Sequence, residues 1–446
     1  MPINKTDFIS LAASFYDEDG SSYPDLLQEA AIFLAARRPY RKPAVPILVV
    51  DDYDHRLAAA KRLEHQLAIS QPDFSLSTTA FAALLTIPRA MLDDMAKTYC
   101  EDPKASTRSN GHIVICRALD EIGACTKHFF GNPTAEKYED LTPSSTSATA
   151  SGTETAASPE ASTAQAVGGR RYTRNMAQRR LCLERHGHKC ILTGASNPAI
   201  CHVVPYAWNK SLSNIRKTRR HFESIQPFLH SEQSGDLIRL LLGQVGCSDR
   251  TWNLIPLSPQ LHDWWGRGVW AFKYLDTETK EVQGTDPTAM KRNKKGKKFQ
   301  GAKKKVHTVI IQFYWMPRRR QGEILDPKAK MDWEKEGQEG SRVLDRLEET
   351  APPDMKVFNV GNNRPILTGE TCLVDFAEVE DAENFKRMIE LQWAIIQISA
   401  MAGGAGAPEL LSDVDWDSDG GLKLWWEEEE EEEEEEENEG DLSEAG

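Results

Sequence analysis

Two short motifs, about fifty residues apart, constrain the fold of this chain more than any other feature. The first places Thr193-Gly194 before Cys201-His202-Val203-Val204-Pro205. The second runs Asn253-Leu254-Ile255-Pro256-Leu257 and continues to Leu261-His262. A histidine on a strand can act as a general base, and a histidine on the following helix can hold a metal ion. The order His, Asn, His therefore predicts a minimal site for cleaving phosphodiester bonds.

The residues around these motifs alternate between strand and helix patterns. Apolar strands are predicted at 189–192 and 200–204, with a turn between them and Pro205 after the second. Ser258-Pro259 is a helix start, so 260–265 is predicted to be helical. Further helices are expected at 175–185, 221–228 and 237–242, paired strands at 269–275 and 306–315, two short strands within 357–376, and a helix at 381–401.

The chain divides into five predicted segments. Residues 1–130 form a mainly helical N-terminal domain, with helices at 25–37 and 54–67 and a strand at 43–50. Residues 131–169 are rich in Ser, Thr and Ala and read as a disordered linker. Residues 170–330 contain the two motifs, 331–406 form an α+β extension that packs on them, and 407–446 are a disordered acidic tail. The expected fold class is α+β.

Charge is distributed unevenly along the chain. The net charge is −14, yet residues 170–330 hold 31 Lys and Arg against 12 Asp and Glu, a balance of +19. Residues 409–446 carry a balance of −18, with eleven consecutive Glu from Glu427 to Glu437. A basic region that contains the two motifs favours a phosphate-bearing partner, and nucleic acid, in particular double-stranded DNA, is expected.

A dense basic cluster lies between the strands predicted at 269–275 and 306–315. Three interpretations are open: it grips nucleic-acid phosphates, it is a nuclear localisation signal, or it is a solvated loop. The charge of the surrounding region favours the first. The candidate nucleic-acid-binding residues are Lys291, Arg292, Lys294, Lys295, Lys297, Lys298, Lys303, Lys304 and Lys305.

The acidic tail has its own alternatives. It is a solubilising appendage, or it folds back on the basic region and competes with DNA, or it binds histones and other basic proteins.

Eight cysteines without a Cys-x-x-Cys pair argue against a zinc ribbon or a disulfide scaffold. The first residues lack a signal pattern, and no run approaches the roughly 18 apolar residues that span a bilayer. A soluble intracellular protein without a membrane partner is expected, in the nucleus if the basic cluster directs it there.

Residues 180–275 resemble an HNH endonuclease domain, in the variant found in uncharacterised fungal proteins. The resemblance rests on the Cys and Thr-Gly of the first strand, His-Val-Val-Pro, Asn-Leu-Ile-Pro-Leu and Leu-His. It implies a ββα-metal core in which His202 is the general base, Asn253 positions the loop that carries it, and His262 binds one divalent metal ion. A weaker resemblance extends through Arg364-Pro365-Ile366-Leu367-Thr368-Gly369 to about residue 406.

Two departures from the family pattern bear on the metal. The second metal ligand usually precedes the base, and here that residue is Cys201. A thiol favours zinc over magnesium, so the expected ion is Mg²⁺, Mn²⁺ or Zn²⁺. Where family members carry an aromatic-Asp pair after the second histidine, this chain has Trp265-Gly266. The leading hypothesis is a metal-dependent nuclease acting on DNA. The alternatives are an inactive module of the same fold that binds nucleic acid, and a protein that interacts with chromatin.

Overall fold

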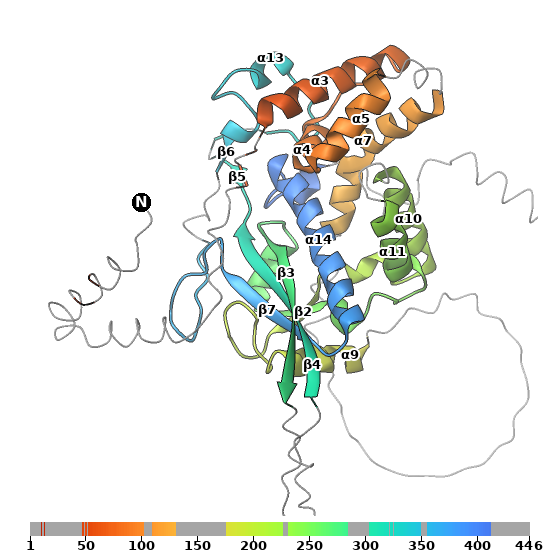
Figure 1. Ribbon diagram of the computed structural model, residues 1–446. Helices are drawn as coiled ribbons and strands as arrows, with labels where there is room; N and C mark the ends of the chain where they lie inside the picture. The colour runs from red at the N-terminus through yellow and green to blue at the C-terminus, as the bar shows by residue number, and fades with distance from the viewer. Residues whose placement is uncertain are drawn as a thin grey trace, which may run out of the picture. The chain divides into compact units, whose positions relative to one another are not determined.

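The protein combines helices with small antiparallel sheets, which places it in the α+β class (Figure 1). The computed structural model describes residues 47–48, 50, 52–101, 109–130, 175–225, 231–283, 303–320, 322–323, 325–348 and 355–411, together with Ser10 and Ala13. A compact unit ends at Leu411. The predicted linker at 131–169, the predicted acidic tail from residue 412 onward and the helix expected at 25–37 lie outside these residues.

The described helices and strands follow one another in a mixed order. The helices are α3 (Tyr53–Ser70), α4 (Thr78–Thr86), α5 (Arg89–Ala96), the π-helix η1 (Lys97–Glu101), α7 (Ser109–Phe130), α9 (Met176–Arg185), η2 (Tyr206–Trp208), α10 (Leu212–Ile225), α11 (Ser231–Leu242), η4 (Thr251–Asn253), α12 (Pro259–Trp265), α13 (Trp333–Glu336), η5 (Leu344–Arg346), α14 (Val379–Met401) and η6 (Pro408–Leu411). The strands are β1 (Ala199–His202), β2 (Leu254–Leu257), β3 (Trp270–Gln283), β4 (Lys303–Trp315), β5 (Arg318–Arg319), β6 (Leu347–Glu348) and β7 (Thr371–Phe376).

The N-terminal part is helical where the structure describes it. The helix predicted at 54–67 is confirmed as α3. Helix α4 begins where the Ser77 hydroxyl accepts a hydrogen bond from the Ala80 N–H, and eight of its nine residues are buried. The strand predicted at 43–50 is wrong at Ile47 and Leu48, which lie in a turn. Pro46 directly precedes them, and proline disfavours strand pairing.

A three-stranded sheet, in the order β3-β4-β7, supports the C-terminal half. Strands β3 and β4 pair antiparallel from Trp270 opposite Trp315 to Gln283 opposite Lys303, and this confirms the pairing predicted for 269–275 with 306–315. The long helix α14 packs on β3 (Figure 1), and the Gln392 side chain accepts a hydrogen bond from the Phe272 N–H at 3.1 Å. The two sequence motifs lie beside this sheet and helix.

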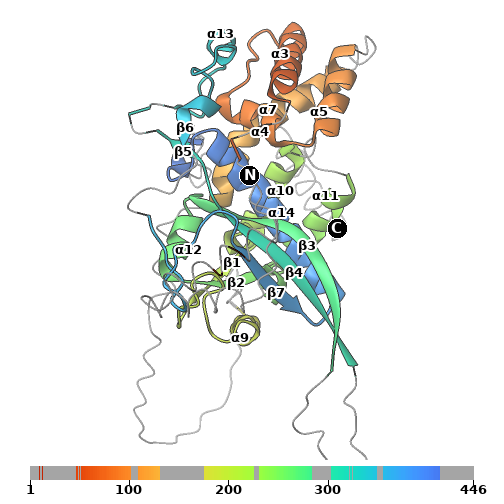
Figure 2. The same ribbon diagram turned by 60° about the vertical axis from the view of Figure 1, so that its left-hand side comes forward.

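Strands β1 and β2 pair antiparallel, with His202 opposite Leu254, and α12 follows β2 directly. Figure 2 shows β1, β2, α12 and α9 gathered together, and α9 and α12 contact both strands. The strand predicted at 189–192 is wrong. Gly194 adopts a φ of 70° there, and its N–H bonds the Cys190 carbonyl in a tight turn. The partner of β1 is therefore β2, some fifty residues later in the chain.

Buried apolar side chains from α3–α7, β1–β4 and α14 belong to one continuous cluster. Trp264, Trp265 and Trp270 all lie in it. Leu411 is buried too, so the first residues assigned to the acidic tail belong to the folded part. The domain boundaries drawn from the sequence stay a prediction. Among the helices of the described residues, none is long and apolar enough to span a membrane.

Two histidines meet where α7 packs on α10. The ring centroids of His128 and His221 lie 4.6 Å apart, His128 stacks on Trp208, and His128 Nε2 lies 3.0 Å from Thr218 Oγ1. Burial, together with the charges of His221 and Lys217, lowers the pKa of His128 to about 3. Burial also lowers the pKa of His221 to about 4, although Glu121 acts in the opposite direction. Both imidazoles are neutral in the folded protein at pH 7.

The free energy of unfolding should therefore fall as the pH is lowered from about 6.5 toward 4. In this window the unfolded chain binds protons that the two buried rings do not, so acid favours unfolding. Replacing His221, which is 3% exposed, with Phe is expected to reduce this slope by up to about 1.4 kcal/mol per pH unit. Urea titrations at pH 7, 6 and 5 measure it. The exposed His65 of α3, replaced by Gln, is the control, and equal slopes in both variants would contradict the prediction.

Candidate functional site

His202 occupies the last position of β1, and strand alternation sets the direction of its side chain. Neighbouring residues of a strand point to opposite faces, so His202 and Ile200 share one face while Cys201 points to the other. Ile200 packs with Cys182 of α9 and Leu254 of β2. His202 is therefore directed toward the side of the strand that α9 covers, and its side chain is 7% exposed.

A buried carboxylate holds the imidazole of His202. Asp249 Oδ1 lies 3.1 Å from His202 Nε2, and the Asp249 side chain is fully buried. The other carboxylate oxygen, Oδ2, accepts a hydrogen bond from the backbone N–H of Asn175, which caps α9. The ring of Tyr206 lies beside the imidazole, with centroids 5.3 Å apart. Asp249 and Asn175, both distant from His202 in the sequence, thus form a chain of hydrogen bonds that ends at this histidine.

Opposing effects act on the carboxyl group of Asp249. Burial by itself would raise the pKa of Asp249. The hydrogen bonds from His202 and from the Asn175 N–H, with the charges of His202 and Arg179, outweigh burial and hold this pKa below its usual range. Asp249 is therefore ionised at neutral pH. The stability that it contributes is present above about pH 4, the ordinary carboxyl pKa, and is lost as the pH falls through its lowered value.

The ionised carboxylate fixes the tautomer of His202. A carboxylate only accepts hydrogen bonds, so the proton of the neutral ring lies on Nε2 and the lone pair on Nδ1. Nδ1 is then the ring nitrogen that can take up a proton. If it does so, the adjacent negative charge of Asp249 stabilises the imidazolium that forms.

Asn253 ties the residues after His202 to the loop that carries Asp249. Its side chain is fully buried, and its Oδ1 accepts a hydrogen bond from the Val204 N–H at 2.9 Å. Its Nδ2 donates to the Val204 carbonyl at 2.9 Å and to the Ser248 carbonyl at 3.1 Å. Its backbone carbonyl accepts from the Val203 N–H at 2.8 Å. Both the amide oxygen and the amide nitrogen of Asn253 thus form hydrogen bonds with backbone groups close to His202 and Asp249.

The second histidine of the motif lies on α12. Ser258 caps this helix by accepting a hydrogen bond from the Leu261 N–H, and Pro259 occupies its first position, so the predicted helix start is confirmed. His202 thus ends β1, Asn253 immediately precedes β2, and His262 lies on α12.

Residues 190–273 match the family model of the HNH endonucleases. The HNH match contains His202, Asp249, Asn253 and His262, and it ends within β3. It begins after α9, so Asn175 and Arg179 lie outside it. Among curated proteins and among solved structures, none matches the chain.

HNH domains commonly use a divalent metal ion, and the ligands predicted from the sequence are Cys201 and His262. Cys201 is 2% exposed in the apolar core, and its thiol lies 3.6 Å from the Ala199 carbonyl, on the face of β1 opposite to His202. His262 is half-buried on α12. Within the described ranges, His, Cys, Asp and Glu side chains form no group of three or more that could hold a metal ion. The expected site needs only two protein ligands, so the assignment of Cys201 and His262 to a metal stays a prediction.

The predicted basic cluster falls mostly outside the described residues. Lys291, Arg292, Lys294, Lys295, Lys297 and Lys298 lie there. Lys303, Lys304 and Lys305 are on β4, opposite Gln283, Val282 and Glu281 of β3, and Lys305 is exposed. The role of this cluster in binding nucleic acid stays a prediction.

Sequence reasoning missed Asp249. No periodic pattern marks it, because it lies in the irregular turn between α11 and η4. One signal was present: it stands four residues before Asn253, and no other acidic residue lies between Asp236 and Asp263. A lone carboxylate beside a motif asparagine is a candidate partner for the motif histidine.

Proposed function

We propose that the HNH domain hydrolyses phosphodiester bonds in nucleic acid, with double-stranded DNA as the substrate class and a ββα arrangement of β1, β2 and α12 as its core. The observation that carries the proposal is the hydrogen bond from His202 to the buried, ionised Asp249, within a segment that matches the HNH endonucleases. A histidine oriented by a carboxylate is suited to remove a proton from water.

In this proposal His202 Nδ1 takes the proton from a water molecule as its oxygen attacks the scissile phosphorus. Asp249 keeps the ring in the required tautomer and balances the charge that it gains. Asn253 is a positioning residue, because its hydrogen bonds fix the backbone of Val204 and Ser248 on either side of the pair. The phosphorus–oxygen bond to the leaving oxygen then breaks, and that oxygen is protonated.

The test is nicking of supercoiled plasmid by the full chain, with Mg²⁺, Mn²⁺ or Zn²⁺ supplied in separate reactions. His202→Ala is expected to lower the nicking rate at least about a hundredfold, because the general base is lost. The control is His188→Asn, an exposed histidine of the same domain with a φ of 60°, a conformation that asparagine tolerates. If wild type and His202→Ala nick at the same rate, hydrolysis by this site is excluded.

A second function, a module that binds nucleic acid without cutting it, is favoured by two observations. No group of three metal-ligating side chains exists within the described residues, and the His202 side chain is only 7% exposed. The two functions differ in one result. Binding of labelled duplex DNA, measured by fluorescence anisotropy, with no nicking in any of the three metals would support the module and contradict the enzyme.

A further inference from the structure

Helix α10 carries positive charge on one side and packs through the other. It lies in the insertion between the first motif and Asn253, and it contacts α7. Its buried side chains are Ile215, Thr218, His221 and Phe222. Its basic side chains are Arg216, Lys217, Arg219 and Arg220. At 100° per residue, Arg216, Lys217 and Arg220 fall on the half of the helix that faces away from the buried set, and Arg219 lies at the edge of that half.

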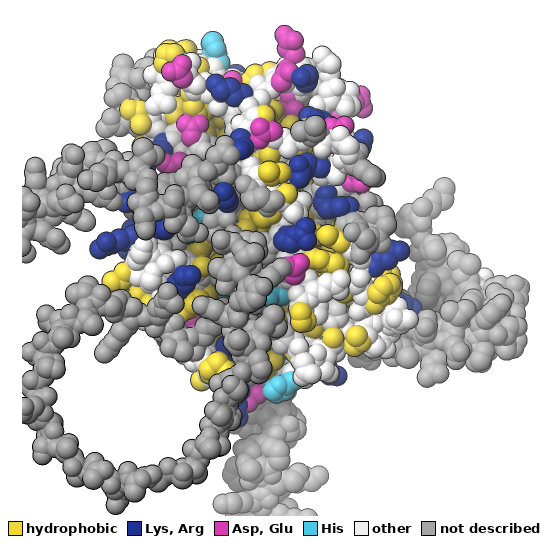
Figure 3. Space-filling model, turned by 180° about the vertical axis from the view of Figure 1, so that it is seen from behind, with side chains coloured by type: hydrophobic (Ala, Val, Ile, Leu, Met, Phe, Trp, Pro, Cys, Tyr) yellow, Lys and Arg dark blue, Asp and Glu magenta, His cyan; other side chains and the backbone are white. Residues whose placement is uncertain are grey.

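Two of these arginines are available to a partner. Arg216 and Arg219 are exposed, and neither forms an ion pair with another residue of the described part of the chain. Like charges three residues apart on a helix destabilise it by a few tenths of a kcal/mol. Figure 3 shows Lys and Arg side chains at several places across the rear face. Arg216 and Arg219 therefore match a negatively charged partner.

The helix is fastened to both segments that build the His202 site. Thr218 Oγ1 donates to the Trp208 carbonyl at 3.0 Å, which holds α10 to η2, and η2 includes Tyr206 beside the His202 ring. The buried Asn209 donates from Nδ2 to Ser248 Oγ at 2.8 Å and contacts the thiol of Cys247. Ser248 precedes Asp249. The orientation of α10 is thus coupled to the residues around the proposed general base.

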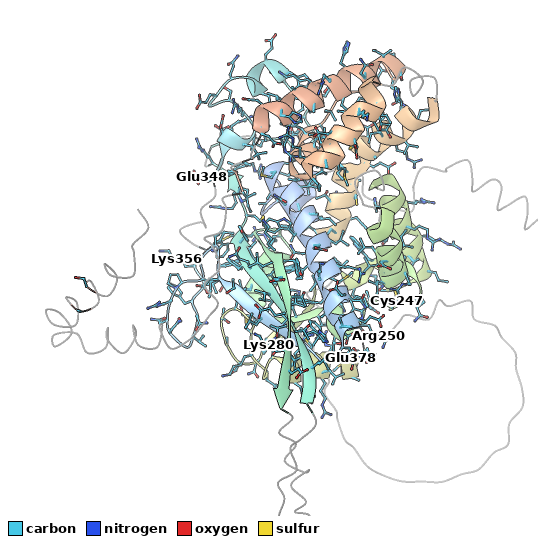
Figure 4. The ribbon with its side chains drawn as sticks, in the orientation of Figure 1. Cys247, Arg250, Lys280, Glu348, Lys356 and Glu378 are labelled. Carbon is cyan, nitrogen blue, oxygen red and sulfur yellow. The ribbon has the colours of Figure 1, made fainter. Side chains whose placement is uncertain are left out.

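Arg250 is closer to Asp249 in the chain than Arg216 and Arg219 are, but it has acidic neighbours. Figure 4 shows Arg250 near the start of α14, together with Glu378. Burial raises the pKa of Asp381 in that helix, Glu380 and Glu378 raise it further, and the charges of Arg185 and Arg250 oppose them. The charge of Arg250 therefore acts on an acidic neighbourhood, whereas Arg216 and Arg219 face outward.

We propose that the outward face of α10 binds backbone phosphates of double-stranded DNA and holds the duplex beside His202. The guanidinium groups of Arg216 and Arg219 each present paired N–H donors that match phosphate oxygens. They lie about one helical turn apart, so two phosphates can be held together. The inference rests on the proposed function for the identity of the partner, and it assigns the contact to the insertion helix rather than to the Lys291–Lys305 cluster.

The test measures binding in EDTA, where cleavage of a labelled 20-base-pair duplex is prevented, across a salt series. Arg216→Gln with Arg219→Gln in the full chain is expected to weaken binding roughly tenfold or more at 0.1 M salt. The slope of log K against log salt should flatten by about two, since each lost phosphate contact removes about 0.9. The matched control is Arg62→Gln with Lys97→Gln, two exposed cations of α3 and η1. Its slope should equal that of wild type.

An unchanged slope in the α10 variant, or an equal change in both pairs, would overturn the inference. Plasmid nicking separates this failure from that of the proposed function. Nicking that depends on His202, with an unchanged slope, contradicts the α10 contact alone. A flattened slope in a protein that nicks nothing supports the α10 contact and contradicts hydrolysis. Thermal unfolding of each variant confirms that the fold is retained.

Discussion

Asparagine in place of Asp249 is expected to lower the nicking rate by about 10²–10⁴-fold while the protein stays folded at neutral pH. The two carboxylate oxygens accept from two different donors, His202 Nε2 and the Asn175 N–H. An amide keeps only one acceptor, so its NH₂ group must face one of these N–H groups. The Asn175 donor is fixed by the backbone. The imidazole is therefore the partner that changes tautomer or rotates, and Nδ1 no longer presents its lone pair to water.

Nicking rate and the state of the imidazole are both measurable. Nitrogen-15 NMR of the histidine rings should report the Nε2–H tautomer for His202 in wild type and its loss in Asp249→Asn. The control is Asp236→Asn, which makes the same charge change at a partly exposed aspartate that pairs with Arg387. Wild-type nicking by Asp249→Asn, with the tautomer altered, would show that Asp249 does not position His202 for the reaction.

Alanine in place of Asn253 is expected to lower the free energy of unfolding by about 3–5 kcal/mol. The substitution leaves the Val204 N–H, the Val204 carbonyl and the Ser248 carbonyl without their side-chain partners in a fully buried position. An unsatisfied buried polar group costs about 1–3 kcal/mol each. Asn253→Asp should be strongly destabilising too, because a carboxylate would face two carbonyl oxygens.

Urea denaturation measures this loss. Asn362→Ala serves as the control, since its exposed side chain makes a single hydrogen bond to the Arg364 N–H. Surface changes of this kind are expected to stay within about 0.5 kcal/mol. A loss below about 1 kcal/mol for Asn253→Ala would mean that water or a backbone shift satisfies the three groups, and that Asn253 does not hold the site together.

Local patterns predicted the elements that depend on local interactions. The Ser258-Pro259 start of α12, the pairing of β3 with β4 and the length of α14 follow from capping, alternation and helical periodicity. The prediction failed at 189–192, where an apolar run suggested a strand. The positive φ of Gly194 closes a turn there, and a single-residue conformation of this kind outweighs apolar character over four residues.

The candidate site was only partly accessible from the sequence. His202 and Asn253 could be found because each stands beside an apolar run of characteristic form. Asp249 could not, because its pairing with His202 joins residues separated by the insertion that contains α10 and α11. Cys201 was predicted as a ligand from its place before the base, yet strand alternation directs its thiol into the core.

The hydrogen bond from Asn175 to Asp249 sets a lower limit on the length of any active fragment. The family match begins at residue 190 and therefore excludes α9. A fragment cut to the match would lose the Asn175 donor and the charge of Arg179, and it would lose the Gln178 side chain that accepts from the Thr251 N–H at 2.9 Å. Asp249 would then be open to water, and His202 would lose its fixed orientation. Any dissection of this protein into smaller pieces therefore has to retain the chain from Asn175 onward.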